Sequence, residues 1–240
     1  MPERRVDILL IGGGVACAAA ARTLADGDFG GSVLLAAREL DPPYERPPLT
    51  KEYLRGDSTK QDAYVATGDA QVLTRTGVTK LDTSAREATL ATKEVVAYDR
   101  ALIATGAMVR RLQVEGAELE GLHYLRAFGN SDAIRRDVAQ AERVVCVGGS
   151  YIACEVAASL TAIGVGVTLV MQEDAPFERS FGPQVGACPS SDSSGAVPDG
   201  GSRRWSPRSR PPARSMRSWR SPSRSSGRRR RSHGSSSPAC

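Results

Sequence analysis

The fold is decided by the stretch Val6-Asp7-Ile8-Leu9-Leu10-Ile11-Gly12-Gly13-Gly14-Val15-Ala16-Cys17. Its apolar half predicts a buried parallel strand, and the alanine-rich residues 15–24 predict a helix that starts directly after the glycines. Residues 32–36 predict the next strand, which completes a βαβ unit. In a dinucleotide-binding turn the first glycine permits the bend, the second lets a pyrophosphate approach the backbone, and the third lets helix and strand pack closely. Gly12 and Gly14 can fill the first two roles, and the small Cys17 takes the third.

A second unit of the same kind lies further along the chain. Residues 143–147 and 167–170 predict strands, and residues 151–163 predict a helix that ends before Gly164. The turn reads Gly148-Gly149-Ser150-Tyr151-Ile152-Ala153, so that a serine replaces the middle glycine and an alanine the last one. One such turn can be a loop without a ligand, but two in order predict an α/β fold with two Rossmann-like nucleotide-binding units.

Shorter elements are expected between the two units. Residues 77–81, 88–90 and 98–106 predict strands, and residues 131–141 predict a helix capped by Ser131.

An acidic residue after the second strand of each unit is expected to bind the adenosine ribose. The candidates are Arg38 and Glu39 in the first unit and Glu173 and Asp174 in the second. Carboxylates favour ribose hydroxyls over a 2′-phosphate, so NADH is preferred over NADPH. The alternative interpretation is that these are ordinary solvated loop residues.

Three segments resemble a known family. The segment Asp41-Pro42-Pro43-Tyr44-Glu45-Arg46-Pro47-Pro48-Leu49-Thr50-Lys51 is similar to the P-Y-x-R-P-P-L-S-K segment of ferredoxin and rubredoxin reductases. These are FAD-dependent, NAD(P)H-oxidising members of the pyridine nucleotide–disulfide oxidoreductase superfamily, related to apoptosis-inducing factor. Ala104-Thr105-Gly106 resembles the family's A-T-G turn, and Val147 to Glu155 resembles its V-G-G-G-x-I-G-x-E motif. The resemblance covers about residues 5–187.

This resemblance implies electron transfer from NAD(P)H through FAD to a [2Fe–2S] ferredoxin or a rubredoxin. Lys51 and Glu155 are then the catalytic pair, with Lys51 near the flavin and Glu155 beside the hydride path. Arg38 stands where the family usually has an acid, so that Glu39 becomes the substitute ribose ligand. The implied cofactor-binding residues are Gly12, Gly14, Val15, Ala16, Arg38, Glu39, Pro48, Lys51, Val78, Ala104, Thr105, Gly106 and Arg126 for FAD, and Gly148, Gly149, Ser150, Tyr151, Ile152, Glu155 and Glu173 for the nicotinamide nucleotide.

The composition changes after about residue 187. The chain carries a net charge of +5, but this comes from residues 188–240, which are rich in Ser, Arg, Pro and Gly and hold only two acids, Asp192 and Asp199. Such a segment buries too little apolar surface to order itself, so a disordered basic tail is expected. We therefore expect an FAD-binding domain at 1–108, a partial NAD(P)-binding domain at 109–187 and a tail at 188–240. Both nucleotide units would be incomplete.

The abrupt break suggests the hypothesis of a reductase that is truncated and frameshifted after about residue 187. Two alternatives to an active reductase remain: an inactive remnant with weak nucleotide binding, and an Arg-rich tail that binds nucleic acid through phosphates. Low-complexity charged runs usually carry no dedicated site, which makes the nucleic-acid reading the weaker one.

Five cysteines are scattered along the chain without a C-x-x-C spacing. This pattern supports neither a redox-active dithiol nor a zinc knuckle, and it favours small buried packing residues in a cytoplasmic protein. No metal site and no membrane span are expected.

Overall fold

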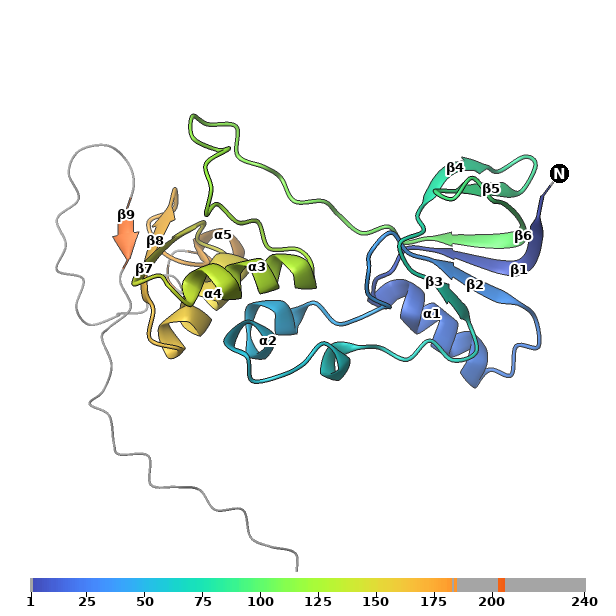
Figure 1. Ribbon diagram of the computed structural model, residues 1–240, viewed down its shortest axis with the longest axis horizontal. Coiled ribbons are helices and arrows are strands. Elements are labelled where there is room, and N and C mark those ends of the chain that lie inside the picture. Colours follow the sequence, from blue (N-terminus) through green and yellow to red (C-terminus); the bar gives the residue numbers. More distant parts are fainter. Residues whose placement is uncertain (1, 183, 185–202, 206–240) are drawn as a thin grey trace, which may run out of the picture. The chain divides into compact units, whose positions relative to one another are not determined.

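The computed structural model describes residues 2–182, 184 and 203–205. The first sheet has the spatial order β3-β2-β1-β6-β5-β4 (Figure 1). β3, β2, β1 and β6 are parallel neighbours, whereas β6, β5 and β4 pair antiparallel. The strands are β1 (Arg4–Ile11), β2 (Val33–Ala36), β3 (Gln71–Leu73), β4 (Val78–Asp82), β5 (Glu87–Leu90) and β6 (Val95–Ile103).

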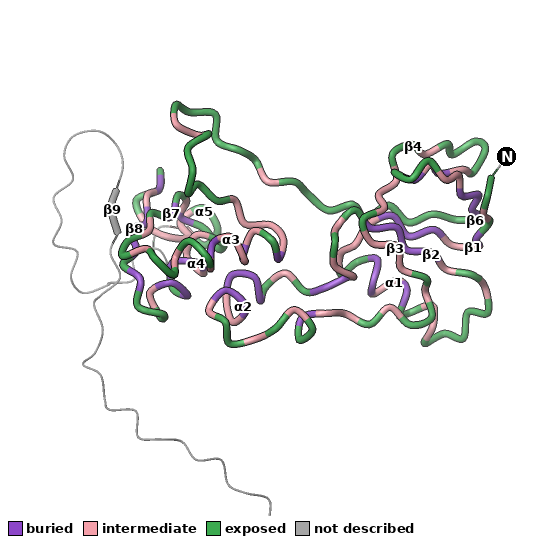
Figure 2. The backbone as a smooth tube through the Cα atoms, in the orientation of Figure 1, coloured by how far each residue is buried: buried purple, intermediate pink, exposed green. Residues whose placement is uncertain are grey.

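The second half of β1 is buried (Figure 2). Because the successive residues Leu9 and Leu10 are both buried, the strand is covered on both of its faces, as the sequence predicts. Leu10 packs in a cluster with Cys17 and Ala21 of helix α1 (Val15–Asp26). Leu9 points to the opposite face and packs with Leu90 of the antiparallel strands. Each fully buried leucine contributes about 1.5–3 kcal/mol relative to its exposed state. The expected packing role of Cys17 is confirmed, since its side chain is fully buried.

The register of the parallel strands brings their carboxyl ends to one edge. Ile11 lies beside Ala36 of β2 and Ile103 of β6. The expected strand over 98–106 begins earlier and ends at Ile103, so that Ala104 to Gly106 lie just beyond this edge. Ligands in open α/β sheets bind outside the carboxyl ends of the strands. The glycine turn after β1 and the segments that follow β2 and β6 therefore lie together at the carboxyl edge of the first sheet.

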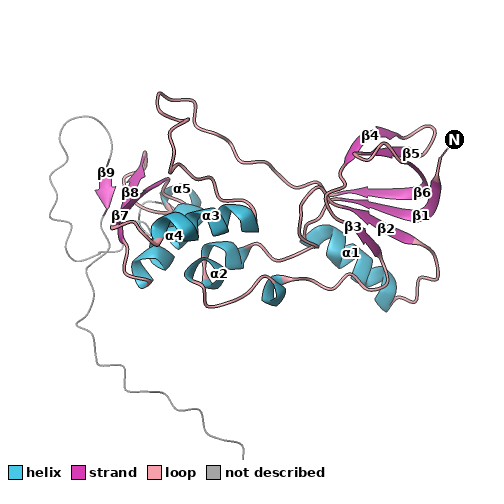
Figure 3. Ribbon diagram, in the orientation of Figure 1, coloured by secondary structure: helices cyan, strands magenta, loops and turns pink. Residues whose placement is uncertain are grey.

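An aromatic cluster holds the segment between the two units. Phe128 is fully buried, and its ring centroid lies 4.2 Å from that of Tyr44, 4.7 Å from Tyr53 and 6.3 Å from Tyr64. These tyrosines lie in or near three short helical segments, η1 (Pro47–Thr50), α2 (Glu52–Arg55) and η2 (Gln61–Ala63) (Figure 3). Aromatic pairs in such tilted and edge-on arrangements stabilise beyond their buried area.

The helix expected over 131–141 is shifted toward the N-terminus, and its predicted cap is wrong. α3 spans Phe128–Val138, and Ser131 lies inside it, fully buried. The hydroxyl of Ser131 donates to the carbonyl oxygen of Leu49 at 3.1 Å. The side-chain oxygen of Asn130 accepts from the backbone amides of Arg126 at 3.1 Å and Ala127 at 2.9 Å. The hydroxyl of Ser131 is therefore used in a buried hydrogen bond to a distant carbonyl oxygen, and the side chain of Asn130 caps the helix instead.

The second sheet has the order β7-β8-β9, with β7 and β8 parallel and β9 antiparallel to β8. Its elements are β7 (Arg143–Val147), α4 (Tyr151–Ala162), β8 (Gly166–Met171), α5 (Glu178–Phe181) and β9 (Arg203–Trp205). Gly164 follows α4 with a φ of 92°, which confirms its expected place just past the helix. Leu160 of α4 packs in one core cluster with Leu169 of β8, Leu54 of α2 and Ile134 of α3.

Within residues 188–240, the structure describes only β9, which pairs with β8. The rest of the segment for which a disordered tail was expected lies outside the described residues. None of the helices among the described residues is long and apolar enough to cross a membrane.

Candidate functional site

The first glycine turn is shaped by a close approach to the segment after β6. Gly12 has a φ of 139°, and a Cβ atom added there would lie 2.2 Å from the carbonyl oxygen of Ala104. A Cβ on Gly13 would lie 2.8 Å from the Cβ of Ala37. No side chain other than hydrogen fits at either position. The turn therefore presents bare backbone, as a pyrophosphate site requires.

Helix α1 starts at this turn with an open N-terminus. Gly14 is its N-cap residue, and a Cβ there would meet no heavy atom within 4 Å. Val15 and Ala16 are exposed, and the first turn holds no acidic residue. The unpaired amides and the positive end of the helix dipole favour an anion at such a terminus.

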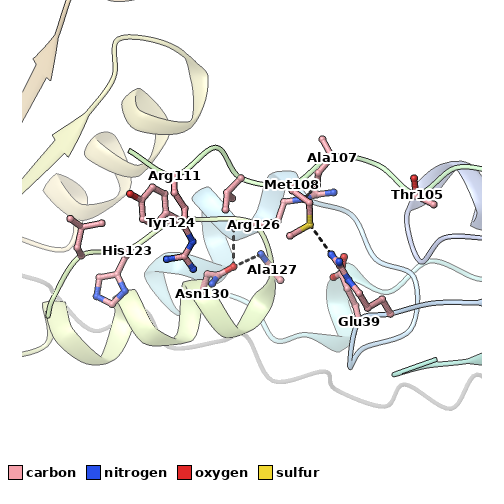
Figure 4. Close-up of a pocket in the computed structure, with 13 residues that line it drawn as sticks. Glu39, Thr105, Ala107, Met108, Arg111, His123, Tyr124, Arg126, Ala127 and Asn130 are labelled. Carbon is pink, nitrogen blue, oxygen red and sulfur yellow. Dashed lines mark hydrogen bonds between the residues drawn. The ribbon is translucent and has the colours of Figure 1, made fainter. Parts of the chain in front are cut away.

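The turn after β6 is held by Arg126. Gly106 has a φ of 70°, and a Cβ there would lie 2.9 Å from a guanidinium nitrogen of Arg126. The Nε of Arg126 donates to the carbonyl oxygen of Ala107 at 2.9 Å. Thr105 and Arg126 line a cavity of about 330 Å³, in which Figure 4 shows Arg126 close to Asn130.

Arg38 and Glu39 both line this cavity, but only Glu39 is strongly engaged by its neighbours. The guanidinium of Arg46 donates to Glu39 Oε1 at 2.5 Å and to Oε2 at 3.0 Å, and the Tyr44 hydroxyl donates to Oε2 at 2.7 Å. Burial alone would raise the pKa of Glu39, but the hydrogen bonds from Arg46 and Tyr44 outweigh it and hold the pKa below its ordinary value. Glu39 is therefore a charged carboxylate whose charge is already balanced.

The proline-rich loop is tied to the second unit. Lys51 Nζ lies 2.9 Å from Glu155 Oε1, so that the expected ion pair is present. The Thr50 hydroxyl donates to Glu155 Oε2 at 2.5 Å, and Ser159 donates to the Thr50 carbonyl oxygen at 2.6 Å. Burial acts to raise the pKa of Glu155, but the hydrogen bonds from Thr50 and Lys51 hold the pKa below its ordinary value. Two residues of one turn of α4 thus fix the loop that carries Lys51.

The second glycine turn tolerates its substituted last position. Gly148 has a φ of 126°, and a Cβ there would lie 3.4 Å from the Cβ of Ala153, which is an ordinary contact. A Cβ on Gly149 would lie 2.9 Å from the sulfur of Met171 and 3.2 Å from Glu173 Oε2. Ala153 therefore leaves room at Gly148, whereas a Cβ on Gly149 would displace the side chain of Met171, the last residue of β8.

The helix after this turn also starts with exposed residues. Ser150 is the N-cap residue of α4, and its side chain makes no capping hydrogen bond. Tyr151 is 49 % exposed and Ile152 is 56 % exposed. Glu173 lies 2.5 Å from the Nε of Arg179. The expected ribose ligand of this unit is therefore half of an ion pair.

A family model described as pyridine nucleotide-disulphide oxidoreductase matches residues 6–191. The chain belongs to this FAD-dependent oxidoreductase family. Its resemblance to ferredoxin and rubredoxin reductases is confirmed by curated relatives. It is 34 % identical to the probable ferredoxin reductase CtmF of Castellaniella defragrans, over 70 % of this chain and 42 % of that protein. It is also 34 % identical to rhodocoxin reductase of Rhodococcus erythropolis, over 73 % of this chain and 43 % of that protein.

Solved structures agree with the curated relatives. The ferredoxin reductase for the CYP199A2 system from Rhodopseudomonas palustris matches with a TM-score of 0.71 and 27 % identity, over 75 % of this chain and 46 % of that chain. The covalent complex of putidaredoxin reductase and putidaredoxin matches with a TM-score of 0.70 and 30 % identity, over 78 % and 46 %. The chain spans less than half the length of the curated relatives it matches.

Most of the predicted site residues fall into four groups, the first of which is the glycine turn before α1 with Gly12, Gly14, Val15 and Ala16. Arg38, Glu39, Thr105 and Arg126 line one cavity, while Lys51 and Glu155 are in contact. The second glycine turn forms a separate group. The other predicted FAD ligands line no part of the cavity; among them, Pro48 is buried in η1, and Val78 is half-buried at the start of β4. The cofactor roles of all these residues stay predictions.

Several residues that line the cavity were not predicted, because no sequence motif marks them as part of a site. All of them except Asn130, which lies in α3, are on the segment between Gly106 and α3, and this segment has no regular structure over most of its length. In Figure 4, Arg111 lies against Tyr124, and the guanidinium lies 5.3 Å from the ring centroid. Only Asn130 could have been found from the sequence, because an asparagine beside a helix start is a common cap. The residues missed are Ala107, Met108, Val109, Arg111, Leu122, His123, Tyr124, Ala127 and Asn130.

Proposed function

We propose that this chain belongs to an NAD(P)H-dependent flavoprotein oxidoreductase that passes electrons through FAD to a ferredoxin or rubredoxin. The family match and the names of the relatives support this function. A [2Fe–2S] centre is our proposal for the ferredoxin. We also propose NADH as the preferred donor, because Glu173 follows β8, where a carboxylate binds ribose hydroxyls.

The first unit fits an FAD pyrophosphate. The cradle formed by Gly12 and Gly13 leaves no room for a Cβ, and α1 begins beside it with exposed residues. We assign residues 1–108 to FAD binding and residues 109–187 to NAD(P) binding. When bound, FAD supplies the acceptor for a hydride and releases single electrons.

The contact between Lys51 and Glu155 is the observation that carries the proposal. It joins the loop that follows the first unit to the helix that follows the second glycine turn. A cation held there favours negative charge on a reduced flavin. Glu155, which Thr50 also holds, orients the ammonium group of Lys51. The two units are thereby connected at the residues that the resemblance implies for hydride transfer.

The described cysteines offer no alternative route for the electrons. Cys17, Cys146 and Cys154 are free thiols. Burial raises the pKa of Cys17, and burial together with the nearby Cys154 raises the pKa of Cys146 to about 11. These two thiols stay protonated at neutral pH and are poor nucleophiles. Direct transfer from flavin to an iron–sulfur partner fits this arrangement.

The test is the visible absorption spectrum of the purified chain after incubation with FAD and desalting. We expect a retained flavin spectrum that bleaches when NADH is added under anaerobic conditions. Glu155→Gln should keep the flavin but slow its reduction about tenfold. This decrease corresponds to an activation barrier that is higher by about 1.4 kcal/mol. Glu52→Gln is the matched control, because Glu52 lies next to Lys51 and takes part in none of the ion pairs among the described residues. A soluble sample that retains no flavin would contradict the proposal.

A further inference from the structure

The cavity beyond the first sheet contains more positive charge than a site for an uncharged ribose needs. It lies where β2 and β6 end, and Arg38, Arg111 and Arg126 all line it. None of the ion pairs among the described residues includes any of these three arginines. A guanidinium carries five donors, so each of the three keeps donors for a ligand.

The contacts that these arginines do make leave their charge unbalanced. A terminal nitrogen of Arg38 lies 2.8 Å from the sulfur of Met108. Arg111 lies over the ring of Tyr124, and Arg126 donates to a backbone carbonyl. Sulfur, an aromatic face and a carbonyl are neutral partners. The three guanidinium groups therefore keep their full positive charge beside the cavity.

The acidic group in the cavity does not offset this charge. Both terminal nitrogens of Arg46 donate hydrogen bonds to Glu39 and balance most of its charge, and Arg126 adds a weaker electrostatic interaction with the same carboxylate. The lining also holds His123, whose Nε2 lies 2.7 Å from Asp137 Oδ2. The lining is thus cationic on balance.

Arg38 occupies the position that discriminates between ribose groups in dinucleotide folds. It comes two residues after the end of β2, and its Cβ lies beside Gly77. A carboxylate at this place binds the 2′-hydroxyl, whereas an arginine accommodates a 2′-phosphate. Planar guanidinium groups match phosphate oxygens two at a time, which makes such contacts both strong and selective.

We propose that the first unit binds 2′-phosphorylated adenine nucleotides more tightly than nucleotides with a free ribose, with Arg38 as the discriminating residue and Arg111 and Arg126 as additional donors. The inference rests on the proposed function, because it takes the first unit to be an adenine dinucleotide site. FAD has no phosphate on its ribose. Nucleotides that carry one therefore compete with FAD for the first unit.

The experiment measures displacement of FAD by adenosine 2′,5′-bisphosphate and by ADP, followed by flavin fluorescence. It uses the full chain with Ser150→Asp, which keeps a good helix cap but puts a carboxylate where the second turn would accept a pyrophosphate. We expect the bisphosphate to displace FAD at a concentration at least about tenfold lower than ADP. Arg38→Glu should abolish this ratio and tighten FAD binding, and Arg38→Lys should retain part of the ratio. Arg100→Glu is the control, because Arg100 is exposed on β6, lines no part of the cavity and changes the net charge equally.

Equal potency of the two nucleotides, or a ratio that Arg38→Glu leaves unchanged, would overturn the inference. Calorimetry of the two nucleotides with the FAD-free chain measures the same ratio directly. A chain that retains no FAD but prefers the bisphosphate would contradict the proposed function and support this inference. A chain whose FAD is reduced by NADH, but which binds the two nucleotides equally well, would support the proposed function and contradict this inference.

Discussion

The first glycine turn makes the sharpest prediction about stability, for the substitution Gly12→Ala. The backbone of Gly12 has a φ of 139°, which strains a residue with a side chain by about 1–3 kcal/mol. The new Cβ would lie 2.2 Å from the carbonyl oxygen and 2.8 Å from the carbonyl carbon of Ala104. Both are backbone atoms, so no side-chain rotation relieves the overlap.

The overlap has to be relieved by separating β1 from the segment after β6. The amide of Ala104 donates to the carbonyl oxygen of Ile11 at 2.9 Å, and this bond is the first to be lost. A lost hydrogen bond costs about 0.5–1.5 kcal/mol, and more when the freed group stays buried. Together with the backbone strain, the free energy of unfolding should fall by about 3 kcal/mol or more. That is a large part of the 5–15 kcal/mol that is typical of folded proteins.

The assay is urea unfolding followed by circular dichroism, with Gly14→Ala as the matched control. Gly14 has a φ of −99°, and a Cβ there would meet no heavy atom within 4 Å. Its replacement should therefore cost less than about 1 kcal/mol. The reasoning is refuted if the two variants are equally stable, or if Gly12→Ala unfolds within about 1 kcal/mol of the unmodified chain.

Three further predictions concern the segment between the units. Asn130→Ala removes the acceptor for two backbone amides at the start of α3, and should cost about 0.5–2 kcal/mol in urea unfolding, whereas Asn130→Asp should cost little. Phe128→Ala empties the centre of the aromatic cluster and should cost about 3–5 kcal/mol; a loss below 1 kcal/mol in calorimetric unfolding would contradict the packing described for it. Because the fold lowers the pKa of Glu39, its contribution to stability is present above its ordinary pKa of 4.5 and is lost as the pH falls through the folded value. Unfolding measured from pH 3 to 7 should thus lose stability on acidification more steeply in the unmodified chain than in Arg46→Gln, and parallel curves would refute this.

Much of the architecture was predictable from local sequence patterns. The apolar run before Gly12 predicts a strand, and the alanine-rich run after it predicts a helix. Both predictions are accurate to within a few residues, because strand and helix patterns follow from local backbone geometry. The end of α4 at Gly164 was also predictable from local sequence, because the φ of 92° at this position is unfavourable for any residue with a Cβ. The contact of Lys51 with Glu155 was also expected, but from family resemblance and not from any local pattern.

The failures came where a distant residue competes for a side chain. Ser131 has the chemistry of a cap, yet it donates to the carbonyl oxygen of Leu49, far away along the chain. Local propensity cannot register such a partner, because burial of the helix decides which acceptor the hydroxyl meets.

The sequence by itself thus determined the two βαβ units and their glycine turns, because strand, turn and helix are set by neighbouring residues. Only the tertiary structure decided the charge of the cavity at the end of the first sheet. It pairs Glu39 with Arg46 and leaves Arg38 and Arg126 outside the ion pairs formed among the described residues. Which charges are neutralised depends on distances of a few ångströms between separate segments, and folding alone sets those distances.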